Sequence, residues 1–272
     1  MDRHLDLVRE ELGELVDALT PGPEAEQAFG LYFLPADHPA AELGRHVERS
    51  VFGEFFGNSP ELLAAEYGAY EDTSLFLTVV DHRRRLPAGV MRVIVPSDAG
   101  LKSLADIETA WNQPLGEVLA RTGLEFDDRR VWDVATLAVE KEYRGAASQG
   151  LISMALYQGL ATTALRAGIG WFVTILDLVV LDLLQTLVTD PFRSYDGIEP
   201  MSYLDSPMSV PVWCDIDDWT RRFRAANPDL YDTICLGTGL EAAVHHPDWD
   251  VVVAGIDGFS PLGVPSGVSL LG

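Results

Sequence analysis

The segment EYRGAASQG, residues 142–150, combines an arginine, two glycines and other small side chains between two apolar stretches. The stretch before it has strand character, and the stretch after it has helical period. A helix begins with unpaired backbone N–H groups and a positive dipole end, and small side chains let a phosphate approach them. The segment therefore predicts a phosphate site, with a plain turn as the alternative.

Two polar side chains interrupt apolar strands. Asp133 lies in VWDVATLAV and Arg92 lies in VMRVIVP. A carboxylate at Asp133 can accept a proton from an amine, although it could instead face solvent or pair with Arg129 or Arg130. Arg92 indicates a buried anionic partner, and the alternative is an arginine on the outer face of a half-buried hairpin.

Three further groups are candidates. Glu71 and Asp72 precede the first hairpin strand and either contact an acceptor amine or form a solvated strand start. The arginine run at 83–85 is either a solvated turn or a positive patch for an acidic partner. His245 and His246 stand near two aspartates, but neighbouring histidines rarely point to one ion, so we expect no metal.

Composition narrows the class of protein. The 272 residues include 42 acidic and 19 basic side chains, a net charge of −23, which argues against a nucleic-acid partner. The two cysteines form no metal or disulfide spacing and indicate a reducing compartment, so we expect a cytoplasmic protein. The longest apolar run carries Asp177 and Asp182, so we expect no membrane span.

These residues must be positioned by a mixed α/β sheet. Periodicity predicts helices at 3–19, 39–52, 60–70, 103–121, 151–168 and 181–188, and strands at 74–81, 90–96, 131–139, from Gly170, and within 200–216. The order predicts a mixed sheet rather than a purely parallel one. We expect a core at 1–217 and a C-terminal extension at 218–272 packed on it, with a strand in WDVVVAGIDG. The amphipathic N-terminal helix and the apolar tail are compatible with a homodimer in which they form the interface.

The glycine segment with its flanks, LAVEKEYRGAASQGLISMALYQGLATTALRAG, resembles the acyl-donor-binding segment of the Gcn5-related N-acetyltransferase (GNAT) superfamily. There a strand ends in a V-x-x-x-Y-R-G-x-G-x-G/A loop and a long helix follows. Tyr143 matches, and the resemblance implies that the loop amides hold the pyrophosphate of coenzyme A at Arg144, Gly145, Ala147, Gln149 and Gly150. Ala147 and Gln149 replace glycines, and Gly150 is displaced. The strand itself would offer backbone groups to the pantetheine arm at Leu137, Ala138 and Val139.

A narrower resemblance covers roughly residues 45–215 and points to the branch of acyl-homoserine lactone synthases and long-chain N-acyl amino acid synthases. It rests on a shifted R-x-x-V-F at Arg49 to Phe52, on GVMRVIVP, and on VWDVATLAV. Trp132 and Asp133 match the W-E of that family, whereas Thr136 stands at the place of its arginine. The resemblance implies an acyltransferase scaffold, with Trp132, Arg92 and Glu71 in substrate binding.

The implied reaction moves an acyl group from an acyl-CoA or acyl-carrier-protein thioester to the amine of a small molecule. Acyl transfer needs a base, a group that polarises the carbonyl and an acid for the leaving thiolate. We expect Asp133 as the base. The superfamily places an acid after the fifth strand, where Tyr203 is our candidate beside Ser194 and Tyr195. The alternative is a non-catalytic protein that binds or senses an acyl-thioester, and the replacement of glycines at 147 and 149 favours it. A third interpretation is a protein-modifying acetyltransferase.

Overall fold

A computed structural model describes residues 3–19, 27–145, 148 and 150–259. Its helices are α1 (Arg3–Leu19), α2 (Ala41–Phe56), α3 (Pro60–Tyr67), α4 (Lys102–Thr109), α5 (Leu115–Thr122), α6 (Leu151–Arg166), α7 (Leu178–Leu187), α8 (Ile216–Ala226), α9 (Pro228–Leu236) and α10 (Trp249–Phe259). Its strands are β1 (Phe29–Pro35), β2 (Ser74–Asp81), β3 (Leu86–Ile94), β4 (Val131–Val139), β5 (Trp171–Asp177), β6 (Arg193–Ser194), β7 (Met201–Tyr203), β8 (Ser206–Asp215) and β9 (Val244–His245).

Within the described residues, the strands form one mixed sheet in the order β6-β8-β5-β4-β3-β2-β1-β9, and β7 pairs with β8. The pairs β4–β5 and β1–β9 are parallel, and the other pairs are antiparallel. The predicted mixed α/β fold is therefore confirmed. No described helix has the length and apolar character needed to cross a membrane.

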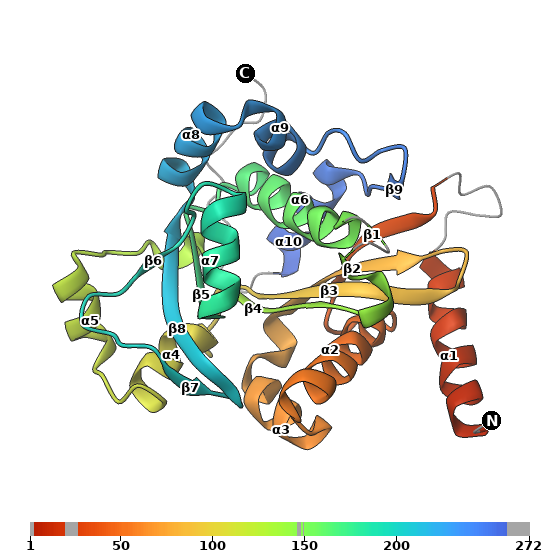
Figure 1. The fold of residues 1–272 in the computed structure, drawn as a ribbon, viewed down its shortest axis with the longest axis horizontal. Helices are drawn as coiled ribbons and strands as arrows, with labels where there is room; N and C mark the ends of the chain where they lie inside the picture. The colour runs from red at the N-terminus through yellow and green to blue at the C-terminus, as the bar shows by residue number, and fades with distance from the viewer. Residues whose placement is uncertain (1–2, 20–26, 146–147, 149, 260–272) are drawn as a thin grey trace.

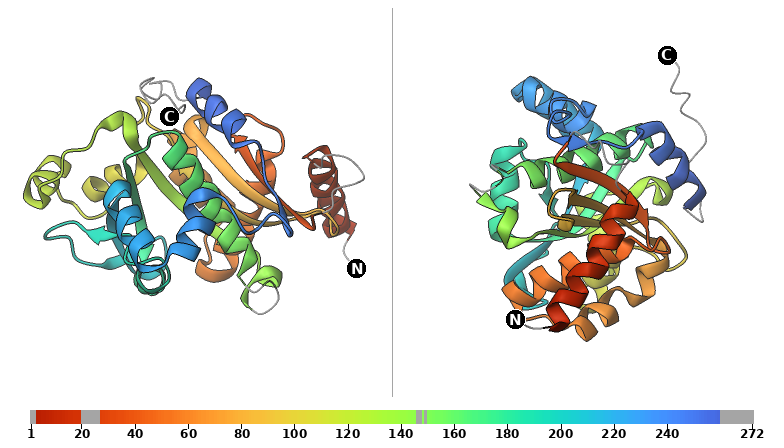
Figure 2. Two further views of the ribbon diagram at one scale, coloured as in Figure 1. Left: turned by 90° about the horizontal axis from the view of Figure 1, so that it is seen from above. Right: turned by 90° about the vertical axis from the view of Figure 1, so that its right-hand side faces the viewer.

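Helices cover both faces of the sheet (Figure 1). On one face α6 packs on β1 to β3, and α9 and α10 pack on α6. On the other face α1 and α2 cover β3 and its neighbours, whereas α4 and α5 lie below β4, β5 and β8. Figure 2 shows α1 at one end of the molecule and α5 at the opposite end. Three hydrophobic clusters follow this division and hold the sheet between the layers.

Local signals explain several boundaries. The Ser59 hydroxyl accepts from the Leu62 N–H at the start of α3, which has Pro60 in its first turn. Asp177 caps α7 in the same way through the Val179 N–H, and Asp215 caps α8 through the Asp218 N–H. These caps fix the boundary between β5 and α7 and the boundary between β8 and α8.

Two expectations about the elements were wrong, and one strand was missed. The single helix at 103–121 is two helices, α4 and α5, because Pro114 cannot continue the first one. The valine run after Trp249 forms α10 instead of a strand, since Asp248 accepts from the Asp250 N–H and starts a helix that packs on α6. The strand β1 was not foreseen, and it lies beside β2.

The C-terminal extension lies on the core. Gln158 of α6 donates from Nε2 to the carbonyl of Thr233 at 2.7 Å, and Thr162 donates to the carbonyl of Ile234 at 3.2 Å. The strand β9 adds to the sheet beside β1. The expected division at 217 falls inside α8, so the chain passes from core to extension within one helix.

Candidate functional site

The central feature is the point where β4 and β5 separate. Their parallel pairing covers Val131 to Asp133 on β4 and ends there. The Thr174 hydroxyl donates to the carbonyl of Val134 at 2.7 Å and bridges the two strands at the last point of contact. Beyond it β4 continues beside β3, and β5 continues beside β8. The two strands therefore splay apart within one sheet.

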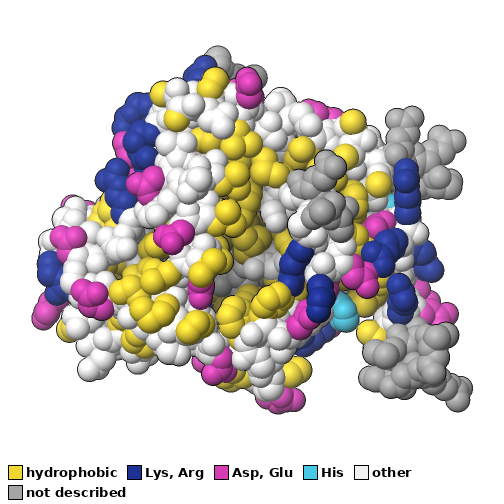
Figure 3. Space-filling model, viewed as in Figure 1, with side chains coloured by type: hydrophobic (Ala, Val, Ile, Leu, Met, Phe, Trp, Pro, Cys, Tyr) yellow, Lys and Arg dark blue, Asp and Glu magenta, His cyan; other side chains and the backbone are white. Residues whose placement is uncertain are grey.

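The space between the splayed strands is a cavity of about 250 Å³. Residues 134–137 of β4 and 174–177 of β5 form its walls. Figure 3 shows the hollow on the face of the molecule that carries α6, α7 and α2, with hydrophobic side chains around it. Because the lining includes residues from helices on both faces of the sheet, the cavity passes through the sheet.

The cavity has two chemically different halves. We call apolar half the part lined by α6 to α9 and the neighbouring strands; its side chains include Leu160, Ala161, Leu184, Val188, Cys214, Trp219 and Ile234. We call polar half the part on the side of α2 and α3; its polar side chains are Asn58, Tyr67, Thr136, Asp177, Tyr203, Ser206 and Ser209, with Phe52, Phe56 and Leu63 beside them.

A chain of hydrogen bonds in the polar half ends on a carboxylate. The Ser209 hydroxyl donates to Ser206 Oγ at 2.9 Å, and the Ser206 hydroxyl donates to Asp177 Oδ2 at 2.7 Å. Asp177 and Ser209 face each other across β5 and β8, so their side chains lie on one face of the sheet. Since Asp177 Oδ1 caps α7, both carboxylate oxygens are fixed. This arrangement can carry a proton from the cavity to Asp177.

Tyr203 belongs to a second cluster at the polar half. The Lys102 ammonium donates to Tyr203 Oη at 2.8 Å, to Asp106 Oδ2 at 2.6 Å and to Glu66 Oε2 at 2.8 Å, and the Tyr203 hydroxyl donates to Asp106. Burial, followed by the charge of Asp106, raises the pKa of Tyr203. Burial lowers the pKa of Lys102, but its bonds to Asp106 and Glu66 outweigh that effect and raise it. The phenol is thus held as a neutral donor.

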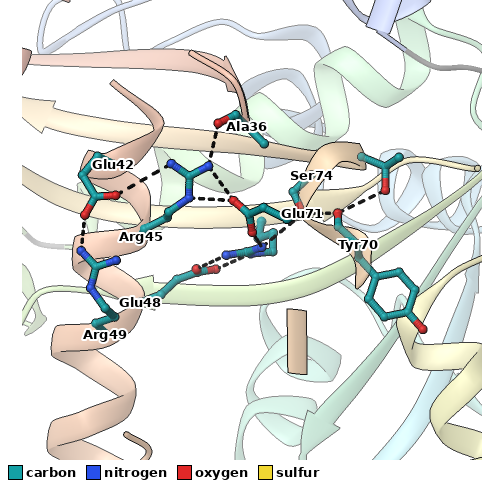
Figure 4. A network of polar contacts seen from close by, with 10 residues as sticks. Ala36, Glu42, Arg45, Glu48, Arg49, Tyr70, Glu71 and Ser74 are labelled. Carbon is teal, nitrogen blue, oxygen red and sulfur yellow. Dashed lines mark hydrogen bonds and ion pairs between the residues drawn. The ribbon is translucent and has the colours of Figure 1, made fainter. Parts of the chain in front are cut away.

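Arg92 contacts Glu48 of α2 and joins a network of charges, and Figure 4 labels Arg45, Glu48 and Glu71 in this network. Its guanidinium donates to Glu48 through Nε at 2.9 Å and Nη2 at 2.6 Å, and to Glu71 Oε2 at 2.8 Å. Arg45 binds the other oxygen of Glu71, and the Thr136 hydroxyl donates to Glu48 Oε1 at 2.5 Å. Burial raises the pKa of Glu71, but Arg92 and Arg45 outweigh it and lower it. The network places Thr136 at the cavity wall.

Asp133 lies away from the cavity. Its carboxylate is fully buried, accepts from the Ser103 N–H and the Ser103 hydroxyl, both at 2.6 Å, and so anchors the first turn of α4. Burial raises its pKa to about 6, against bonds from Ser103 that lower it. Neither Arg129 nor Arg130 pairs with it in the described structure. Trp132 is also buried and is absent from the cavity lining. Asp133 and Trp132 are therefore buried residues that stabilise the fold and do not line the cavity.

The predicted donor loop follows β4 directly. Gly145 and Gly150 have positive φ, of 61° and 78°, and Gly150 precedes α6 without a side-chain cap. Arg144 donates from Nε to the carbonyl of Val139 at 2.5 Å and lies over the Phe55 ring, 4.2 Å from its centroid. Ala147 and Gln149 lie outside the described residues. At the start of α6, the Leu151 N–H donates to the Ser148 carbonyl at 2.9 Å.

The backbone of β4 offers groups to the cavity at alternate positions. The Glu140 N–H donates to the Ala88 carbonyl on β3, and alternate residues of a strand direct their backbone groups to the same neighbour. Ala138 therefore points to β3, whereas Leu137 and Val139 point to the open side. Of the three predicted positions, Leu137 and Val139 have the expected orientation and Ala138 does not.

Two further sets of candidate residues, the arginines at 83–85 and the histidines at 245 and 246, lie outside the cavity lining. Arg84 pairs with Glu142, and Arg85 pairs with Asp17 of α1, so two of the three arginines at 83–85 are neutralised locally. His245 pairs through its backbone in β9. In the described part of the chain, no three His, Cys, Asp or Glu side chains lie close enough to hold a metal ion.

The sequence interpretation missed Asp177, Ser206, Ser209 and Asn58. Asp177 looked like an interruption of an apolar run, and its position as helix cap at the end of β5 was the signal that could have found it. The two serines lie three residues apart in SPMSVP, a spacing that does not predict a contact inside a strand. Asn58 binds the 204–205 turn, which no sequence pattern links to it.

Solved structures of an acyl-homoserine lactone synthase and an N-acyl amino acid synthase share the fold of this splayed sheet. One solved structure with this likeness is BjaI, a CoA-dependent acyl-homoserine lactone synthase with SAM and isopentyl-CoA: TM-score 0.50, 16% identity, covering 84% of this chain and 98% of that chain. A second is FeeM, an N-acyl amino acid synthase from uncultured soil microbes: TM-score 0.50, 13% identity, covering 71% of this chain and 94% of that chain. No family model and no curated protein matches the sequence. The likeness establishes the fold, as the sequence predicted.

Proposed function

We propose that this protein is an N-acyltransferase that moves an acyl group from a thioester donor to the amine of a small molecule. The observation that carries the proposal is the cavity that crosses the sheet between β4 and β5 and joins an apolar half to a polar half. An acyl chain fits the first half, and an amine acceptor fits the second. The thioester carbonyl then lies between the strands, where both can reach it.

The reaction forms a C–N bond and breaks a C–S bond, with one proton leaving the amine and one reaching the thiolate. We assign the base to Asp177, acting through Ser206 and Ser209, because this chain opens on the cavity. Asp133 was our sequence-based candidate, but it does not line the cavity, whereas Asp177 does. Tyr203, supported by Lys102 and Asp106, is retained as the acid for the thiolate.

A bulge in β4 supplies a group for the carbonyl. Arg92 pairs with Thr136 and Val93 pairs with Val134, which leaves Ala135 without a partner on β3. Because Ala135 lies on the cavity wall, we assign polarisation of the carbonyl oxygen to the backbone at this bulge. The network of Glu48 and Arg92 fixes Thr136 beside it.

Donor binding is assigned to the loop after β4. The α6 N-terminus with Arg144, Gly145 and Gly150 would hold the pyrophosphate. The backbone of Leu137 and the N–H of Val139, whose carbonyl is bonded to Arg144, would bind the pantetheine. Side chains from α6, α7, α8 and α9 line the apolar half, which supports an acyl group longer than acetyl. We favour coenzyme A over a carrier protein, because Arg84 and Arg85 are already paired. A small-molecule amine, a cytoplasmic location and a homodimer stay predictions.

The test is release of free thiol from acyl-coenzyme A thioesters in the presence of a panel of amino acids and polyamines, with the N-acyl product identified by mass spectrometry. We expect thiol release that requires both substrates. Release at the same rate without any amine would indicate hydrolysis and contradict the proposal.

A non-catalytic protein that binds an acyl-thioester is the second candidate. It is favoured by the mutual saturation of Lys102, Asp106 and Tyr203 and by the missing glycines at 147 and 149. Saturable donor binding without thiol release for any amine would support this candidate and exclude the enzyme.

A further inference from the structure

We propose that Trp219, at the start of the C-terminal extension, forms the closed end of the apolar half and sets the longest acyl chain that the protein accepts. This inference rests on the proposed function, since it needs an acyl donor in the cavity. It assigns a specificity-determining role to the extension, which the sequence predicted only to pack on the core.

Burial identifies the closed end. Trp219, Val188, Cys214, Leu184 and Ile234 line the cavity and are each less than 9% exposed. They come from α7, α8, α9 and β8, four elements that meet behind the sheet. Val180 and Leu176, which line the same half, are only partly buried. Trp219 therefore belongs to a fully buried wall of the apolar half.

The indole is fixed in place. Its Nε1–H donates to the carbonyl of Val188 at 2.7 Å, and its ring stacks on Phe223 with centroids 5.5 Å apart and planes 12° apart. A rotation of Trp219 would leave a buried donor and a buried carbonyl without partners. The ring cannot move aside for a longer chain without losing this hydrogen bond.

The opposite side of the wall is held as well. Thr189 and Asp190 follow Val188 with positive φ of 61° and 49°, a conformation unfavourable for side chains with a Cβ. Arg222 of α8 donates to the carbonyl of Thr189 and to that of Asp190, both at 3.0 Å. The helix that carries Trp219 thus also clamps the turn against which Trp219 rests.

A fixed wall predicts a sharp length limit. Each methylene added to a chain inside the apolar half should tighten binding about fourfold. Once the chain reaches Trp219, a further methylene must displace packed side chains, so affinity should level off or fall. A loose end would instead give a gradual plateau.

The experiment measures the affinity of the full chain for saturated acyl-coenzyme A thioesters from acetyl to palmitoyl by calorimetry. Trp219→Leu removes the wall, and Trp213→Leu is the matched control. Trp213 is 8% exposed against 5% for Trp219, lies in β8 and does not line the cavity. We expect Trp219→Leu to extend the longest tightly bound chain by about two to four carbons and the control to leave it unchanged.

A second variant keeps the test informative if Trp219→Leu does not fold. Ala161→Leu adds bulk to α6 on the cavity wall and should shorten the longest bound chain. An unchanged length profile in both cavity variants, with donors still bound, would overturn the role of Trp219 while leaving the proposed function intact. Failure of the wild-type chain to bind any donor would overturn both.

Discussion

The two halves of the cavity are held by different forces. In the polar half, charged and hydroxyl groups bind one another across long sequence separations, as Thr136 does with Glu48 and Lys102 with Tyr203. In the apolar half, the side chains of Leu184, Val188 and Ile234 are held by hydrophobic packing. Removing one member of a buried charge pair leaves the other uncompensated, whereas a packed side chain can be replaced by another of similar volume. The polar half should therefore be the less tolerant of change.

The largest expected effect is catalytic. Asp177→Asn keeps an oxygen that can cap α7 but removes the proton acceptor, and we expect the rate of thiol release to fall by about 10² to 10⁴-fold. Donor affinity should change little, because the acyl chain lies in the other half. Single-turnover kinetics and calorimetry on the same preparation separate the two quantities. An unchanged rate would remove Asp177 from the mechanism.

The next effect is on stability. Arg92→Met leaves Glu48 buried beside an apolar side chain, and we expect the free energy of unfolding to fall by about 3–5 kcal/mol. Arg45→Met is the control, since Arg45 is partly exposed and binds the more exposed Glu71. Urea denaturation measures both variants. Equal losses of unfolding free energy in the two variants would show that the effect does not depend on how deeply the ion pair is buried.

A pH dependence follows from Asp133. Its pKa rises from 3.8 when exposed to about 6 in the folded protein, because the carboxyl is buried. Between these values the folded state holds a proton that the unfolded state has lost, so this group lowers stability as pH rises. Relative to Asp133→Asn, the wild type should lose about 2 kcal/mol of unfolding free energy between pH 3.8 and 6. A constant difference across that range would contradict the buried, proton-binding carboxyl.

A conservative substitution in the apolar half should change the free energy of unfolding only slightly. Leu184→Met preserves volume and adds flexibility, and we expect a loss of less than about 1.5 kcal/mol in the free energy of unfolding. Thermal and urea unfolding together check the value. A loss as large as that of Arg92→Met would remove the proposed difference between the halves.

The smallest effect lies outside both halves. The exposed pair of Arg85 and Asp17 should contribute little to stability, so Arg85→Ala sets the baseline for a surface change. Urea denaturation at low and high salt measures it. A larger, salt-independent loss would show that α1 depends on this contact more than its packing through Leu12 and Val16 suggests.

Local patterns predicted most elements of this fold and few of its contacts. The strands at 74–81 and 131–139 and the helix after Gly150 follow from periodicity and glycine placement. The valine run of α10 has high strand propensity, yet packing on α6 and the cap at Asp248 give a helix. Sequence alone could not place Asp133 against Ser103, because α4 reaches β4 only in the folded chain.

The candidate site was predicted in outline. Arg92 was recognised as an arginine that needs a buried anion, and Glu71 is one of the two carboxylates that it meets. The cavity depends on where β4 and β5 stop pairing, a property of the sheet that no single segment encodes. Asp177, Ser206 and Ser209 therefore became candidates only once the strands were placed.

The most direct test of the central claim is a crystal structure of the chain with an S-alkyl-coenzyme A thioether, which cannot transfer its alkyl chain. The account predicts the sulfur between β4 and β5 near Ala135, with the alkyl chain in the apolar half ending against Trp219. An alkyl chain on the surface, or one that enters from the polar half, would contradict it.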